Sequence, residues 1–113
     1  MNVNTKRRFS LSYLDAKIDE LGNRTPWIIE KIEKSSKRVM RRKDDQSYPG
    51  RIKIGEILEQ NLIYASCVAP ASAQVEERLT GSWIGWIIRH FSTKIATIEI
   101  FPDKAKVGKM EEP

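Results

Sequence analysis

The chain has 113 residues and a mass of 13.0 kDa, which suffices for one compact domain or two very small modules and excludes a large multidomain enzyme. Its 20 Lys and Arg against 15 Asp and Glu give a net charge of +5. The excess is uneven, since residues 1–43 hold 12 basic and 5 acidic side chains and residues 44–113 hold 8 and 10. A basic half joined to a mildly acidic half predicts an anionic partner, nucleic acid first and a membrane surface second.

Cysteine and histidine are each present once, as Cys67 and His90. One cysteine forms no internal disulfide, and one imidazole is too few for most zinc or nickel sites. We therefore expect a cytoplasmic protein without metal or cofactor, and no pattern of nucleophile, base or phosphate loop indicates an enzyme. We also expect no secretory signal and no membrane span, because the most apolar run, residues 83–88, is far shorter than the roughly 20 residues that a spanning helix needs.

A composition change divides the chain near its middle. Residues 41–50 carry no aliphatic side chain and contain a Pro-Gly turn signal. We therefore predict an N-terminal module over residues 1–43, a linker over 44–50, a second module over 51–101 and a flexible tail over 102–113.

The first module is predicted to be strand, helix, helix. Residues 8–12 alternate polar and apolar side chains, which is typical of a short strand. Leu14, Ile18 and Leu21 then follow helical spacing, and Gly22 ends that helix. Thr25 and Pro26 resemble an N-cap and a first helical residue, so a second helix is predicted over residues 26–41.

The second module is predicted to be a small α+β unit. Residues 51–58 and 62–68 are expected to be strands joined by a turn at 59–61, and residues 71–79 a short helix. Aromatic and β-branched side chains favour a further hairpin of residues 83–91 with 95–101. A helix over residues 84–95 is the alternative.

A single strand with two helices buries too little apolar area to fold alone, so the first module needs a partner strand. If a second copy supplies it, the two strands form an antiparallel ribbon over four helices, and the module is an intertwined homodimer. Apolar side chains would form the dimer core, namely Phe9, Leu11, Ile18, Leu21, Ile28 and Ile32. Arg8, Ser10 and Ser12 would face outward, where a two-stranded ribbon reads the edges of bases in the major groove.

The segment Lys6-Arg7-Arg8-Phe9-Ser10-Leu11-Ser12, the patterned helix after it and Gly22-Asn23-Arg24-Thr25-Pro26-Trp27 together resemble the ribbon-helix-helix DNA-binding family of the Arc and MetJ kind. The resemblance covers about a third of the chain. It implies base contacts by Arg8, Ser10 and Ser12. It also implies phosphate contacts, which we assign to Lys6, Arg7, Thr25 and the backbone N–H of Trp27. A helix N-terminus would favour a phosphate there on physical grounds as well.

The predicted function is that of a sequence-specific repressor that binds double-stranded DNA as a homodimer, with a tetramer possible on adjacent sites. The second module would then contact another dimer, an effector or a partner protein. The alternative is an antitoxin, in which the C-terminal part binds a toxin and the N-terminal part autoregulates the operon. The apolar content of residues 51–101 indicates a folded module and favours the repressor.

Overall fold

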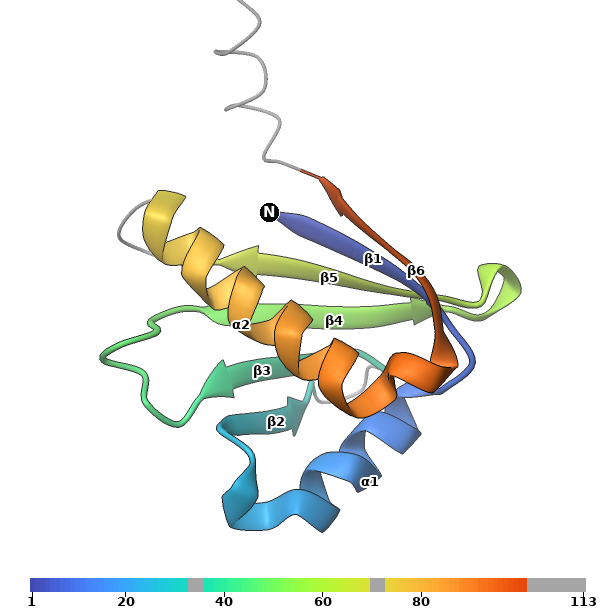
Figure 1. The fold of residues 1–113 in the computed structure, drawn as a ribbon, viewed down its shortest axis with the longest axis horizontal. Helices are drawn as coiled ribbons and strands as arrows, with labels where there is room; N and C mark the ends of the chain where they lie inside the picture. The colour runs from blue at the N-terminus through green and yellow to red at the C-terminus, as the bar shows by residue number, and fades with distance from the viewer. Residues whose placement is uncertain (33–35, 70–72, 102–113) are drawn as a thin grey trace, which may run out of the picture.

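One antiparallel sheet with two helices on one of its faces makes up the fold (Figure 1). The computed structural model describes residues 1–32, 36–69 and 73–101. The six strands are β1 (Asn2–Arg7), β2 (Trp27–Lys31), β3 (Arg38–Arg42), β4 (Arg51–Ile57), β5 (Leu62–Val68) and β6 (Ile95–Phe101). The helices are α1 (Leu11–Leu21) and α2 (Ala73–Phe91), and the 3₁₀ turns are η1 (Gly22–Arg24), η2 (Leu58–Gln60) and η3 (Ser92–Lys94).

The sheet order is β2-β3-β4-β5-β1-β6. Strands β2 to β5 follow one another as a meander, whereas β1 lies between β5 and β6. Strands β3 and β4 flank residues 44–50 and pair with each other, for example Met40 with Ile52. Strands from both sides of the predicted linker therefore belong to the same sheet. The predicted tail, residues 102–113, lies outside the described residues.

The predicted ribbon-helix-helix fold is wrong. The N-terminal strand is Asn2–Arg7 rather than residues 8–12, and both of its neighbours, β5 and β6, come from its own chain. The described part of the predicted second helix, residues 26–41, forms β2 and β3, which pair as a hairpin. No intertwined ribbon is needed, because β1 gains both of its partner strands within one chain.

The C-terminal predictions were partly right. The strands predicted at 51–58, 62–68 and 95–101 are confirmed as β4, β5 and β6. In the N-terminal part of the chain, the helix predicted over 14–21 lies within α1. The preferred strand at 83–91 is wrong, because those residues form the second half of α2. Buried Trp83, Ile87 and Phe91 recur every fourth residue, which places them on one helical face.

The core lies between the two helices and one face of the sheet. Alternate strand residues point into it, including Val3, Met40, Ile52, Ile54 and Ile63, each at most 1 % exposed. The indole N–H of Trp83 donates to the sulfur of Met40 over 3.3 Å and so links α2 to β3. The Phe9 ring stacks on Phe91 at a centroid distance of 4.5 Å, which joins the start of α1 to the end of α2.

Two arginines are buried on the same face of the sheet. Arg7 is 5 % exposed, and its guanidinium contacts Glu56 on β4 at 2.5 Å and donates to the Asn61 side chain over 2.8 Å. Arg38 on β3 is 7 % exposed and pairs with Asp15 of α1 at 2.9 Å. The Arg7 pair joins β1 to β4, and the Arg38 pair attaches α1 to the sheet.

Candidate functional site: a cationic groove beside α2

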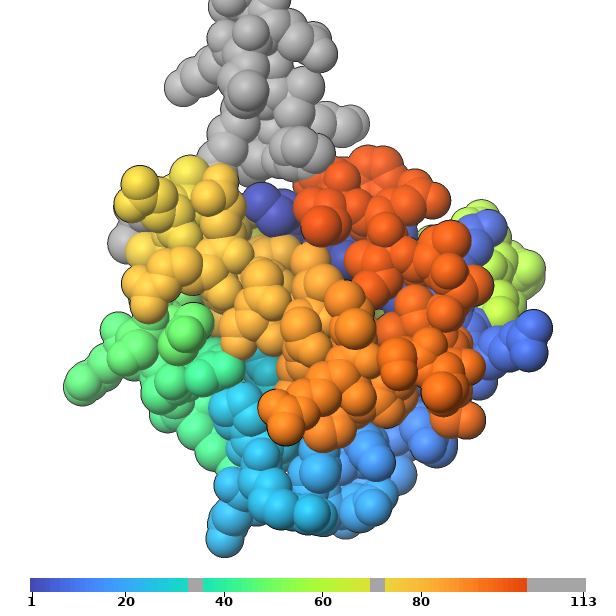
Figure 2. All heavy atoms as spheres, in the orientation of Figure 1, coloured from blue at the N-terminus to red at the C-terminus, as the bar shows by residue number. Residues whose placement is uncertain are grey.

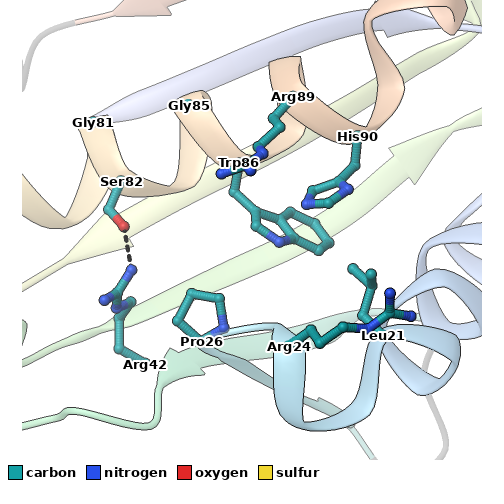
Figure 3. Close-up of a pocket in the computed structure, with 10 residues that line it drawn as sticks. All are labelled: Leu21, Arg24, Pro26, Arg42, Gly81, Ser82, Gly85, Trp86, Arg89 and His90. Carbon is teal, nitrogen blue, oxygen red and sulfur yellow. Dashed lines mark hydrogen bonds between the residues drawn. The ribbon is translucent and has the colours of Figure 1, made fainter.

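A groove of about 480 Å³ lies between α2 and the segment that connects α1 to β2. We call it the α2 groove. Figure 3 shows Ser82, Trp86 and His90 of α2 on one side of it, with Leu21, Arg24 and Pro26 opposite. The other lining residues are Arg42, Gly81, Gly85 and Arg89. Its volume falls within the range of small-molecule sites, roughly 300–1,000 Å³.

Helical periodicity explains how α2 builds its wall. Ser82, Trp86 and His90 are spaced by four residues, as are Gly81, Gly85 and Arg89. Residues four apart lie above one another on a helix, so these triplets form two adjacent rows along the groove. The Trp86 and His90 rings pack at a centroid distance of 5.1 Å and give the wall an aromatic section.

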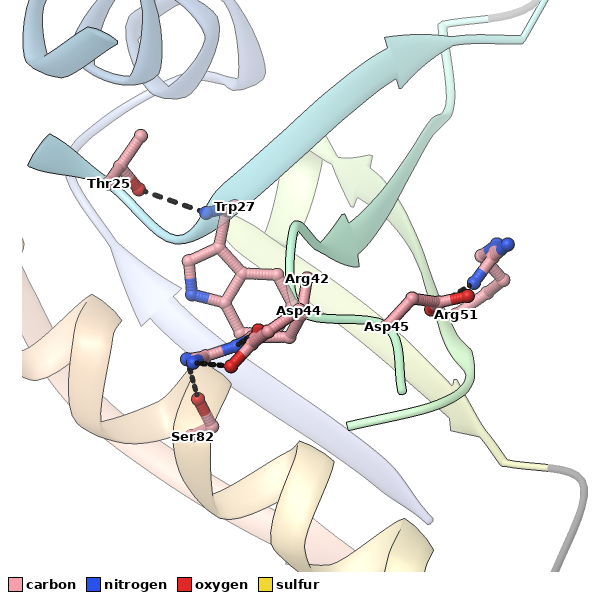
Figure 4. Close-up of polar contacts among 7 residues, drawn as sticks. All are labelled: Thr25, Trp27, Arg42, Asp44, Asp45, Arg51 and Ser82. Atoms are coloured by element: carbon pink, nitrogen blue, oxygen red, sulfur yellow. Dashed lines mark hydrogen bonds and ion pairs between the residues drawn. The ribbon is translucent and has the colours of Figure 1, made fainter. Parts of the chain in front are cut away.

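Arg42 closes one end of the groove and is held in place by several contacts. Its guanidinium binds both oxygens of Asp44, at 2.7 and 2.9 Å, and donates to the Ser82 hydroxyl over 2.7 Å (Figure 4). The Tyr48 ring lies 4.2 Å from the same guanidinium. The hydrogen bond with Asp44 raises the pKa of Arg42, and the same bond lowers the pKa of Asp44. Arg42 is therefore a fixed cation that is already partly neutralised.

Arg24 and Arg89 differ from Arg42 because neither has an ion-pair partner within the described residues. Both side chains are exposed at the rim of the groove, Arg24 from η1 and Arg89 from α2. No carboxylate is among the groove's lining residues. The rim thus carries two uncompensated positive charges that face an open volume.

His90 responds to this positive field. Burial lowers its pKa first, and the positive charges of Lys17 and Arg89 lower it further. At neutral pH the ring is uncharged, so it can both donate and accept a hydrogen bond.

The indole nitrogen of Trp86 is an unsatisfied donor. Trp86 is only 7 % exposed, and its Nε1 has no hydrogen-bond partner in the part of the chain that the structure describes. A buried donor without a partner costs about 1–3 kcal/mol. The Trp86 ring lines the groove, but Nε1 itself has less than 1 Å² of accessible surface, so this donor is not open to a ligand in this conformation.

Gly81 and Gly85 line the groove without side chains, so the helix backbone is accessible there. A Cβ atom at either position would meet no heavy atom within 4 Å. Alanine would therefore fit, although glycine inside a helix costs about 1 kcal/mol relative to alanine. Packing within the described residues does not explain these two glycines, whereas an occupant that approaches the helix backbone would.

The predicted base-contacting residues do not share a strand face. Arg8 is exposed between β1 and α1. The hydroxyl of Ser10 caps α1 by accepting the N–H of Tyr13 over 3.1 Å, and Ser12 is exposed in the first turn of that helix. The geometry that a base-reading ribbon requires is absent from these three residues.

The predicted phosphate contacts are also dispersed. Lys6 is exposed on β1, whereas Arg7 is buried against Glu56. The Thr25 hydroxyl accepts the backbone N–H of Trp27 over 3.3 Å, and both residues are buried (Figure 4). Trp27 begins a strand, so the helix N-terminus on which the predicted phosphate site depended does not exist.

The residues predicted as a dimer core pack within one chain or lie at its margin. Phe9, Leu11 and Ile18 belong to the core, and Leu21 packs against it. Ile28 is half-buried on β2, and Ile32 is 36 % exposed just beyond that strand.

The groove residues were missed at the sequence level. Arg24 and Arg42 meet α2 only through the tertiary fold. A signal did exist in the four-residue spacing of Ser82, Trp86 and His90, but it has meaning only once residues 83–91 are assigned to a helix.

Metal ligands do not gather anywhere in the described ranges, since no three His, Cys, Asp or Glu side chains there are placed to hold an ion. No helix in those ranges is long and apolar enough to cross a membrane. Comparisons with protein families, with curated proteins and with solved structures found no match to this chain.

Proposed function

We propose that the protein binds an anionic ligand, bearing a phosphate or carboxylate group, in the α2 groove. The observation that carries the proposal is a groove whose unpaired rim charges, Arg24 and Arg89, are both positive and whose lining residues include no carboxylate. The anion would accept hydrogen bonds from these guanidinium groups. A flat apolar part of the ligand would pack on the Trp86 ring beside Pro26.

Trp86 provides the direct test, because its ring lines the groove and the NMR signal of its indole N–H is sensitive to a ligand beside it. The chain has three tryptophans, so a ¹⁵N-labelled sample has three indole signals, and Trp86→Phe identifies the relevant one. Adenosine monophosphate and benzoate are suitable probes for the phosphate and carboxylate alternatives. We expect one of them to shift the Trp86 signal with a Kd of about 1 mM or tighter and to leave Trp83, which donates to Met40, unchanged.

Charge variants test the role of the rim. Arg89→Gln and Arg24→Gln should each weaken binding about tenfold, as expected for loss of a charge-assisted hydrogen bond. Arg8→Gln removes an exposed arginine outside the groove and is the matched control. Equal weakening by Arg8→Gln and Arg89→Gln, or an unmoved Trp86 signal with both probes, would contradict the proposal.

Gly85→Ala separates stability from binding. The added methyl group should stabilise α2 by about 0.5–1 kcal/mol and occupy space on the groove wall. A higher melting temperature with weaker binding is therefore expected. A variant with unchanged affinity would show that the ligand does not approach this wall.

Nucleic-acid binding is the second candidate, favoured by the net positive charge of residues 1–43. This candidate does not involve base contacts by a two-stranded ribbon in the major groove. A single-stranded oligonucleotide and a DNA duplex belong in the same titration. Binding of the duplex that is lost in Lys6→Gln and Arg8→Gln but retained in Arg89→Gln would favour a DNA-binding surface outside the groove.

A further inference from the structure

We propose that the exposed edge of β6 pairs antiparallel with the β6 edge of a second copy of this chain, so that two sheets join into one. The proposal is independent of the ligand in the α2 groove. It rests on the strand's position, on the apolar side chains beside it and on the chemical match of the strand with itself.

β6 is the outermost strand beside β1, and no other strand in the described ranges pairs with its free side (Figure 1). It has seven residues, Ile95–Phe101, with neither lysine nor proline among them. Edge strands are usually protected by such residues or by short length. The opposite edge, β2, fits that rule better, since it has five residues with two charged side chains, Glu30 and Lys31, whereas β6 has one, Glu99.

Large apolar side chains are exposed along the same edge. Ile100 and Phe101 of β6 are 52 % and 42 % exposed. Ile100 pairs with buried Val3 and so points to the α2 side of the sheet, whereas Phe101 pairs with Asn2 and points to the other side. A strand added at this edge would find apolar contacts on both faces. Figure 2 shows the α2 side of the molecule, with β6 beside α2.

The sequence of β6 matches itself in one register. The pairing with β1 is regular from Thr97 onward, because the irregularity falls between Lys6 and Arg7. With Ile98 on the two-fold axis, Ile98 faces its copy and Thr97 faces Glu99 of the other chain. This register keeps the two carboxylates apart, whereas a register centred on Glu99 would place them opposite each other. The two-fold axis is perpendicular to the sheet, so both copies keep their α2 helices on the same side.

The test is the sedimentation behaviour of the full chain and of charge variants in β6. Thr97→Glu places a carboxylate opposite Glu99 of the copy at two symmetric positions. It should raise the dimer dissociation constant about tenfold or more. Thr97→Glu combined with Glu99→Lys replaces this repulsion with attraction and should restore the dimer. Thr93→Glu adds the same charge at an exposed position in η3, outside β6, and should have no effect.

Circular dichroism of each variant establishes that it is folded before association is compared. A wild-type chain that sediments as a monomer at about 100 µM, a concentration at which weak specific dimers form, would overturn the proposal. An equal rise of the dimer dissociation constant in Thr93→Glu and Thr97→Glu would overturn it as well. A double variant whose dimer dissociation constant stays as high as that of Thr97→Glu would also overturn the proposal, because the two charges would then not face each other.

Discussion

Replacing Arg7 with methionine should be among the most destabilising changes in the sheet. Methionine keeps the length and apolar contacts of the side chain but leaves the Glu56 carboxylate without its cation. Removing one partner of a buried ion pair costs about 3–5 kcal/mol. The Glu56 side chain keeps 16 % exposure, and some hydration can reach it. We therefore expect the lower end of that range, about 3 kcal/mol.

The double variant Arg7→Met with Glu56→Leu should recover most of that loss. An apolar pair of similar volume is often as stable as a buried ion pair, because no charge is left without water. Only the Arg7 hydrogen bond to Asn61, 2.8 Å in the native protein, would remain lost. That loss leaves the double variant about 1 kcal/mol below wild type.

Urea denaturation of wild type, both single variants and the double variant measures the coupling between the two residues. Arg8→Met, at the exposed neighbour, is the control and should change stability by less than about 0.5 kcal/mol. The reasoning would be refuted if Arg7→Met cost no more than Arg8→Met. It would also be refuted if the double variant lost the sum of the two single effects.

Three further predictions concern other parts of the chain. Gly55→Val should cost more than 1 kcal/mol in urea denaturation, because a Cβ there would overlap the Tyr64 hydroxyl, and Tyr64→Ala should restore much of the loss. Burial and nearby cations lower the pKa of His90, so the unfolded chain binds its proton first. Stability should therefore fall as pH drops below the ordinary histidine value of about 6.5, and His90→Gln should flatten this dependence. Burial raises the pKa of Cys67. Its thiol should thus react with iodoacetamide at pH 8 far more slowly in the native protein than in urea.

A strand with a clear two-residue period could be predicted from the sequence, as β4 shows, and β5 was predicted as its hairpin partner. The N-terminal strand was misplaced because two of its inward residues, Thr5 and Arg7, are polar. A search for apolar alternation detects only Phe9 and Leu11 and so begins the strand where β1 has already ended. Burial of Arg7 depends on Glu56, which is far away in the chain, and no local pattern contains that information.

The other two wrong assignments of secondary structure, the helix at 26–41 and the strand at 83–91, share a cause. Ile28, Ile29 and Ile32 fit helical spacing after a proline, yet Trp27 is buried at the start of a strand that pairs with β3. The segment with Trp83 and Ile87 is rich in β-branched and aromatic side chains and nevertheless forms a helix over the sheet. In both, tertiary packing outweighs local propensities of a few tenths of a kcal/mol per residue. The α2 groove was out of reach for the same reason, since its walls come from η1, β3 and α2.

The position of β1 has a consequence for how the chain folds. Lys6 pairs with Leu62 on one side and with Thr97 on the other, so β1 must wait for β5, and β6 can pair only after β1 is in place. The meander from β2 to β5 can form from near neighbours, and its β5 edge then stays open until β1 docks. Long-range pairing of this kind slows folding and exposes strand edges in intermediates. Refolding should therefore show a meander that acquires hydrogen-exchange protection early, with β1 and β6 protected last and aggregation competing most strongly in the interval between.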